Sequence, residues 1–229
     1  MQRFNMANQQ LEQQPAQKVG AGFSLVAMQQ AQQTALDCLQ QIAARLEPGI
    51  SEADAVAIAM TVLQQAGAEQ HWHPPIIRFG HNTAKIYSEP STPDSRLGDH
   101  DIFFIDIGPV FAGHEADVGA TFCLGETPVH HQVQQAVHQV FEQVAAHWRA
   151  TGCSGAALYQ VAADAAARYG MVLNHQIKGH RVGDFPHKLY ASGQLGGCDG
   201  VVRSGIWVLE IQLLDPLSGY GGFVEQVLF

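Results

Sequence analysis

The chain has few basic residues and few cysteines for its length. Among 229 residues there are 12 lysines and arginines against 21 aspartates and glutamates, giving a formal net charge of −9. A phosphate-binding face needs clustered Lys and Arg, and these are scattered, so we expect neither a nucleic-acid partner nor a membrane partner. The four cysteines show no C-x-x-C spacing, which excludes a zinc ribbon and is typical of reduced thiols in a cytoplasmic protein.

Long apolar runs are also missing. No stretch reaches the roughly 18 apolar residues of a membrane helix, and the first residues do not have the apolar segment of a secretory signal. Hydrophobic residues still make up 46% of the chain, enough for a sizeable core without disulfides. We expect a loose, Gln-rich N-terminal arm over residues 1–22 and one domain over residues 23–229.

Two pairs of helices are predicted from apolar residues at helical spacing. They cover about 23–46, 51–65, 129–150 and 154–169. The residues that separate and end them correspond at one constant offset of 103 residues: Gly49, Ser51 and Gly67 match Gly152, Ser154 and Gly170. We interpret this as an internal duplication, which predicts two α/β halves with ligands bound at their junction.

Four carboxylates lie in, or at the entrance of, otherwise apolar, strand-like segments. These are Asp106 in 102–110, Asp117 before 118–124, Glu210 in 206–214 and Glu225 in 223–229. Any one of them could face water at a sheet edge. A buried carboxylate is costly unless it is paired or bound to metal, and Lys and Arg are scarce nearby. Four such residues together therefore favour a pair of divalent cations.

An imidazole ligand is available in the segment Gly179-His180-Arg181-Val182-Gly183, whose glycines let the backbone approach a metal closely. Oxygen-rich ligation with one imidazole suits Mn, Co, Fe or Zn. A second histidine, His187, follows seven residues after His180.

These segments resemble the pita-bread metallopeptidases, the family of methionine aminopeptidase, proline-specific aminopeptidase, prolidase and the related creatinase. The matching residues are Asp106 in an Asp-x-Gly strand, Asp117 eleven residues later, His180 in Gly-His-x-x-Gly, Glu210 and Glu225. Any one match is weak, but five in the right order over residues 23–229 are specific. The resemblance implies an α+β pita-bread fold, with two pseudo-symmetric α/β halves around a curved, mostly antiparallel sheet.

The resemblance also implies the chemistry of the site. Two divalent metal ions, with manganese the expected one, would be held by Asp106, Asp117, His180, Glu210 and Glu225. A bridging water would be the nucleophile, and Glu210 would pass its proton to the leaving amine. His187 would hydrogen-bond the substrate or the oxyanion. The implied activity is that of an aminopeptidase or dipeptidase acting on a peptide or small molecule, with Xaa-Pro specificity and a homodimer left open.

One departure from the family pattern affects the substrate site. Tyr87 stands where the family usually has a histidine before the first aspartate, and a phenol titrates far higher than an imidazole. We assign Tyr87 to the substrate site, facing His187. His81 or His73 could replace the missing histidine, although we interpret the segment 71–73 as a loop that lines the cleft.

Two alternatives remain open because of this departure. The metals could serve a C–N hydrolase or lyase acting on a small metabolite, or the chain could be a binding protein that keeps the fold without catalysis. Three basic residues, Arg78, Lys85 and Arg203, could bind a substrate carboxylate as a dipeptidase requires. Solvated surface is the alternative for each of them.

Overall fold

The computed structural model describes residues 14–229, so the first 13 residues of the predicted N-terminal arm lie outside the described part. One sheet runs through the domain in the order β1-β2-β4-β8-β7-β5, with β3 paired to β2 and β6 paired to β7. The strands are β1 Gln70–Phe79, β2 Asp101–Phe111, β3 His114–Glu115, β4 Val118–Leu124, β5 Val172–Leu173, β6 His180–Arg181, β7 Trp207–Leu214 and β8 Gly221–Val227. Every strand pairing within residues 14–229 is antiparallel.

Four α-helices lie within a few residues of the predicted ones. They are α2 Leu25–Ala43, α3 Glu52–Gln65, α4 Pro128–Thr151 and α5 Gly155–Arg168. Ser51 and Ser154 cap the second helix of each pair, accepting hydrogen bonds from the backbone N–H groups of Asp54 and Ala157. The helix pair therefore recurs in the two halves with the same serine cap.

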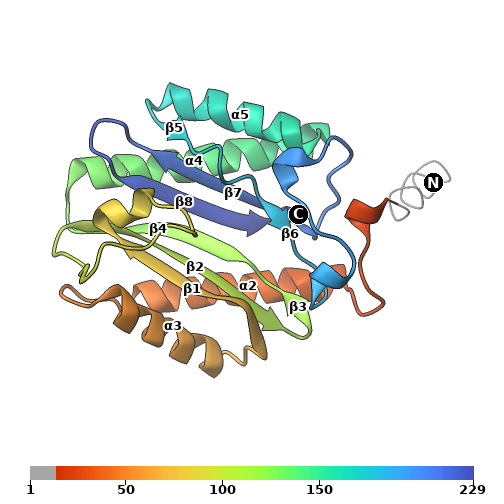
Figure 1. Ribbon diagram of the computed structural model, residues 1–229, viewed down its shortest axis with the longest axis horizontal. Helices are drawn as coiled ribbons and strands as arrows, with labels where there is room; N and C mark the ends of the chain where they lie inside the picture. Colours follow the sequence, from red (N-terminus) through yellow and green to blue (C-terminus); the bar gives the residue numbers. More distant parts are fainter. Residues whose placement is uncertain (1–13) are drawn as a thin grey trace.

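The order of elements repeats along the chain. The segment α2-α3-β1-β2-β3-β4 is followed by α4-α5-β5-β6-β7-β8, and the two halves meet where β4 pairs with β8. Figure 1 shows α2 and α3 beside β1 and β2, and α4 beside β7 and β8. The predicted pita-bread architecture of two α/β halves around an antiparallel sheet is confirmed.

The alternation of side chains along the strands separates the helices from the acids. On β2, Phe103, Ile105 and Ile107 belong to the core beneath α2 and α3. Because successive strand residues point to opposite faces, Phe104 and Asp106 face the other side and line a cavity there. In the second half, Leu209, Ile211 and Leu213 of β7 pack in the core with α4 and α5, while Glu210 and Gln212 line the cavity.

The N-terminal arm lies against the domain from Gln14 onward. Gln17, in the short 3₁₀ helix η1 Pro15–Gln17, is fully buried. Its amide accepts a hydrogen bond from Trp207 Nε1 at 3.1 Å and donates one to the carbonyl of Val201 at 2.7 Å. No helix within residues 14–229 combines the length and hydropathy needed to cross a membrane.

Candidate metal centre

The inner face of the sheet brings the five predicted ligands together. Asp106, Asp117, His180, Glu210 and Glu225 all line one cavity of about 360 Å³. Asp117 and Glu225 are almost fully buried, at 0% and 1% exposure, and Asp106 is 9% exposed. The carboxylates come from both hairpins, so this site lies at the junction of the two halves.

Asp117 is at the middle of the cluster. One of its oxygens, Oδ2, lies 2.8 Å from His180 Nε2, and the other, Oδ1, lies 3.2 Å from His73 Nε2. His73 Nε2 is also 3.4 Å from Asp106 Oδ1, and His180 Nε2 is 3.6 Å from Glu210 Oε1. One ligand atom each from His73, Asp106 and Asp117 lie within 4.8 Å of one another, as do atoms of Asp117, His180 and Glu225.

These carboxylates perturb one another strongly. Burial, with a smaller contribution from Asp117 and Glu210, raises the pKa of Asp106 to about 6. Burial and the neighbouring Asp106 and Asp117 also hold the pKa of Glu225 well above its usual range. Within residues 14–229 no lysine or arginine forms an ion pair with the acids of this cluster. Their only ion-pair partners there are His73 and His180. The site therefore attracts additional positive charge.

The pKa values of both histidines are raised as well, here by the opposite charge of the neighbouring acids. Burial lowers the affinity of His180 for a proton, but Asp117 and Glu210 outweigh it and raise the pKa to about 10. Burial likewise opposes a proton on His73, and Asp106 and Asp117 raise its pKa to about 9. The same carboxylates that favour these protons would favour a divalent cation in their place.

The donor set fits a metal. Asp106 Oδ1, Asp117 Oδ2 and Glu225 Oε1 are buried oxygens that accept no hydrogen bond, and Asp117 Oδ2 is in ion-pair contact with His180. An unsatisfied buried carboxylate oxygen costs more than an unsatisfied neutral group. Carboxylate oxygens together with imidazole nitrogen are the ligands of Mn, Co, Fe and Zn sites.

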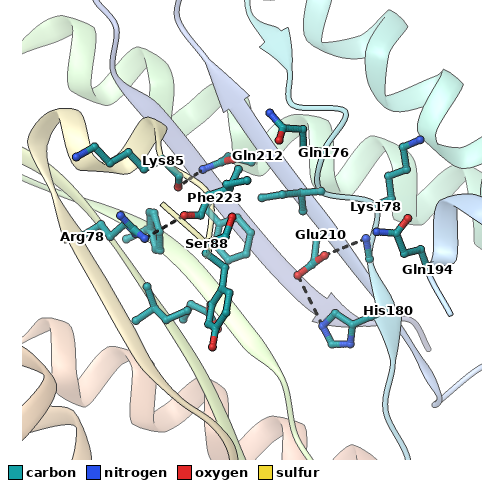
Figure 2. A pocket seen from close by; sticks show the side chains of 17 residues that line it. Arg78, Lys85, Ser88, Gln176, Lys178, His180, Gln194, Glu210, Gln212 and Phe223 are labelled. Atoms are coloured by element: carbon teal, nitrogen blue, oxygen red, sulfur yellow. Dashed lines mark hydrogen bonds and ion pairs between the residues drawn. The ribbon is translucent and has the colours of Figure 1, made fainter. Parts of the chain in front are cut away.

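Glycine residues hold two of the acids in place. Gly179 has a φ of +62°, and its backbone N–H donates a hydrogen bond of 2.9 Å to Glu210 Oε2. Figure 2 shows the carboxylate of Glu210 directed towards His180. Gly119 is the register partner of both Asp106 and Glu225, and a Cβ there would lie 3.1 Å from Glu225 Cγ. The strand thus leaves room for the carboxylates to converge.

His187 is buried at 5% exposure and does not line the cavity that holds the acids. Its Nδ1 lies 2.5 Å from Glu115 Oε2, and its backbone N–H donates to Glu115 Oε1 at 3.0 Å. The ring of Trp72 lies edge-on to it at 5.9 Å and is 5.0 Å from the ring of His180. The role of His187 at the oxyanion thus stays a prediction.

Glu115 and Trp72 were not assigned by the sequence analysis. Glu115 is two residues before Asp117 in the hairpin, and that alternation of acids was the available signal. Its partner His187 is 72 residues away in the sequence.

Tyr87 lines the cavity from an exposed loop, with 69% of its surface accessible. Arg78 holds this loop: its guanidinium donates to the carbonyls of Ile86 at 3.0 Å and Glu89 at 2.6 Å. Arg78 therefore shapes the wall of the cavity that Tyr87 also lines.

The basic residues differ in where they lie. Arg78, Lys85 and Lys178 line an adjoining cavity of about 270 Å³, and Figure 2 shows the amine of Lys178 directed away from the carboxylate of Glu210. Arg203 instead donates to the carbonyl of Gln17 at 3.0 Å and lines neither of these cavities, so the structure does not support its suggested role in binding substrate. Lys178 was missed because nothing in its local sequence distinguishes it from a surface lysine.

Comparison with known proteins places this geometry in context. The family model described as metallopeptidase family M24 matches residues 26–212. A methionine aminopeptidase from Thermotoga maritima is similar in structure, with a TM-score of 0.73, 14% identity, and coverage of 91% of this chain and 92% of that chain. No match was found among curated proteins.

Two other similar structures come from Pyrococcus horikoshii OT3. A prolidase has a TM-score of 0.70 and 20% identity over 89% of this chain, and a dipeptidase has 0.73 and 19% over 88%. This chain spans only 58% and 55% of their respective lengths. At such identities these structures show the shared fold, whereas the family model covers most of the chain. The chain therefore belongs to metallopeptidase family M24.

Proposed function

We propose that the protein is a dinuclear metal-dependent aminopeptidase or dipeptidase, with manganese as its metal. The observation that carries the proposal is the convergence, beside His180, of buried oxygens of Asp106, Asp117 and Glu225 that accept no hydrogen bond. So many buried carboxylates need cations to be stable. Two cations would match the distribution of the acids over the β2–β4 and β7–β8 hairpins.

The five ligands divide between the two metals. Asp106 would chelate one, His180 and Glu210 the other, and Asp117 and Glu225 would bridge them. When bound, the metals would act as Lewis acids and lower the pKa of a water between them. One carboxylate oxygen of Glu210, Oε2, accepts a hydrogen bond from the N–H of Gly179. The other, Oε1, lies near Nε2 of His180. It can therefore accept the proton of the attacking water and return it to the leaving amine.

The cavity suits a short peptide. Its lining combines apolar side chains, including Ile76, Phe104 and Phe223, with Lys178 and the acids. A free α-amino group would lie towards the carboxylates, and Lys178 could contact the carboxylate of a dipeptide. The apolar wall would accept a proline ring, which supports Xaa-Pro dipeptides as one substrate class to test.

The alternatives drawn from the sequence have weaker support. A C–N hydrolase or lyase for a metabolite, and a binding protein without catalysis, both keep the fold, but membership of a metallopeptidase family favours peptide hydrolysis. All four cysteines are free, which supports the expected cytoplasmic location as part of this proposal. A homodimer is likewise a proposal.

The decisive experiment is a peptide panel on chelated protein reloaded with Mn²⁺ or Co²⁺. The panel contains a Met-initiated tripeptide, an Xaa-Pro dipeptide, a dipeptide without proline, and the N-acetylated form of each. We expect cleavage only of free amines, loss of cleavage in Asp117→Asn, and retention in Asp164→Asn, which changes an exposed aspartate of α5. Equal cleavage of acetylated peptides, or none of any peptide, would contradict the proposal.

A further inference from the structure

His73 approaches the acids from the half of the fold opposite to His180. It lies on β1, with Nε2 at 3.2 Å from Asp117 Oδ1 and 3.4 Å from Asp106 Oδ1, and its side chain is 14% exposed. It lines the same cavity as the five predicted ligands. His73 is not among the five ligands of the family pattern, and the sequence analysis offered it only as one replacement for the missing histidine.

The two histidines are held in the same manner. His73 Nδ1 lies 2.8 Å from the carbonyl of Pro74, and His180 Nδ1 lies 3.0 Å from the carbonyl of Arg181. In each case the acceptor is the carbonyl of the next residue. Histidines that bind metal characteristically donate their other N–H to such a group, which fixes the ring and its tautomer. Nε2 is then the nitrogen available to the carboxylates.

The positions of the two histidines in the sheet correspond as well. β1 pairs with β2, which carries Asp106, and β6 pairs with β7, which carries Glu210. Each half therefore presents one imidazole from the strand next to its acid-bearing strand. With His73 included, each half supplies one histidine and two carboxylates to the cluster.

The neighbouring strand leaves room for the His73 ring. Gly108 on β2 is the register partner of His73, and a Cβ on Gly108 would overlap Cδ2 and Nε2 of that ring. Trp72 packs edge-on against His73, with ring centroids 4.5 Å apart, and its Nε1 donates to the carbonyl of Ala116 at 3.2 Å. The ring is therefore constrained on two sides with Nε2 towards the acids.

We propose that His73 is a sixth metal ligand, coordinating through Nε2 the cation held by Asp106 and Asp117. The proposal rests on the dinuclear centre of the proposed function and adds an imidazole to the metal that would otherwise have oxygen ligands alone. Binding replaces the proton that Nε2 shares with Asp117, and the proton is released to solvent. A nitrogen ligand at this metal should favour Co²⁺ and Zn²⁺ over Mn²⁺ relative to an all-oxygen site.

The test is metal content and not activity. Full-length wild type, His73→Ala and His73→Phe are chelated, dialysed to equilibrium against Co²⁺ or Mn²⁺, and analysed for bound metal and for the visible spectrum of Co²⁺. His71→Ala is the matched control, because His71 is also on β1 but lines neither cavity. Circular dichroism of the chelated proteins shows whether each variant folds, and His73→Phe keeps a ring in the space if His73→Ala does not fold.

We expect both His73 variants to bind one Co²⁺ where wild type and His71→Ala bind two. The affinity of the site formed by Asp106 and Asp117 for Co²⁺ should fall in these variants. Loss of a residue that only supports a metal ligand typically costs about 10–100-fold in affinity, and loss of a ligand itself should cost more. The fall should be smaller for Mn²⁺ than for Co²⁺, and the Co²⁺ spectrum should lose intensity at that position.

Two bound Co²⁺ ions of unchanged affinity and spectrum in the His73 variants would overturn the proposal, even if peptide cleavage fell. Such a fall would instead make His73 a substrate-binding residue. Wild type that binds two metals but cleaves no peptide would remove the peptidase proposal alone, leaving the His73 result to be decided by metal content. Wild type that binds no cation would overturn both.

Discussion

Glu210 and Glu225 are register partners on the adjacent antiparallel strands β7 and β8. Like charges directly opposite each other destabilise a sheet, and burial of Glu225 at 1% exposure removes the water that would screen them. The same strands belong to the core of the second half through Leu209, Ile211 and Val224. The packing of the opposite face thus holds two acids together that would otherwise separate.

Removal of metal should therefore destabilise the protein. Treatment with a chelator should lower the melting temperature, and Mn²⁺ at 100 times its dissociation constant should raise it by about 5–10 °C, from about 2.7 kcal/mol of linkage for a domain of this size. Scanning fluorimetry checks this, with Mg²⁺ at the same ionic strength as the control for non-specific screening. An identical melting temperature with and without Mn²⁺ would count against a metal centre among these acids.

The effect of metal on stability should grow with pH. In the chelated protein, Asp106 and Asp117 raise the pKa of His73 from 6.5 to about 9 despite its burial, and Asp117 and Glu210 raise that of His180 to about 10. Because both histidines bind a proton more tightly in the folded than in the unfolded protein, their protonated forms stabilise the folded state. This stabilisation is complete below pH 6.5 and is lost as pH rises through about 9 to 10. The raised pKa of Asp106, about 6, acts in the same direction at lower pH.

Melting temperatures of chelated protein should accordingly fall between pH 6.5 and 9. The increase on adding Mn²⁺ should become larger over the same interval, because fewer protons must leave the histidines. The measurement is a pH series with and without Mn²⁺ at constant ionic strength. A melting temperature of the chelated protein that rises with pH across this interval would show that other groups dominate.

The sequence was sufficient to predict the fold and to select the four acids and the His180 segment as a group. This worked because Asp106 and Glu210 each interrupt an otherwise apolar, strand-like segment, where a buried carboxylate needs a partner or a metal. It was not sufficient for His73. β1 has register shifts between His71 and His73 and between His73 and Ile76, and at such irregularities alternation no longer says which face a residue occupies. Because no acid is near His73 in the sequence, its segment was interpreted as a loop, whereas the structure places it in β1.

Metal binding should require glycine at position 108, although Gly108 itself offers no ligand atom. In Gly108→Ala the new methyl group would displace the rings of His73 and Trp72, which lie where that Cβ would be. We expect weaker binding of Co²⁺, by about 10-fold or more as for other supports of a ligand, with isothermal titration as the measurement. Gly197→Ala is the matched control because a Cβ there meets nothing within 4 Å.

The contact between Glu115 and His187 should affect turnover without affecting metal content. Glu115 is 1% exposed and accepts three hydrogen bonds, from the backbone of Gly183 and from the backbone and ring of His187. A carboxylate against Nδ1 fixes the orientation of the imidazole that would contact the oxyanion. Glu115 would thus be a positioning residue for His187.

His187→Ala should lower kcat by roughly 10²-fold, the effect of losing one such donor, while bound metal stays as in wild type. Glu115→Gln should lower kcat in the same direction, and the double variant should be no slower than His187→Ala, because residues that act through one another are not additive. If His187 only fastens the loop, His187→Ala should lose stability but keep its kcat at low temperature. Measuring kcat, metal content and melting temperature on the same three variants separates these two outcomes.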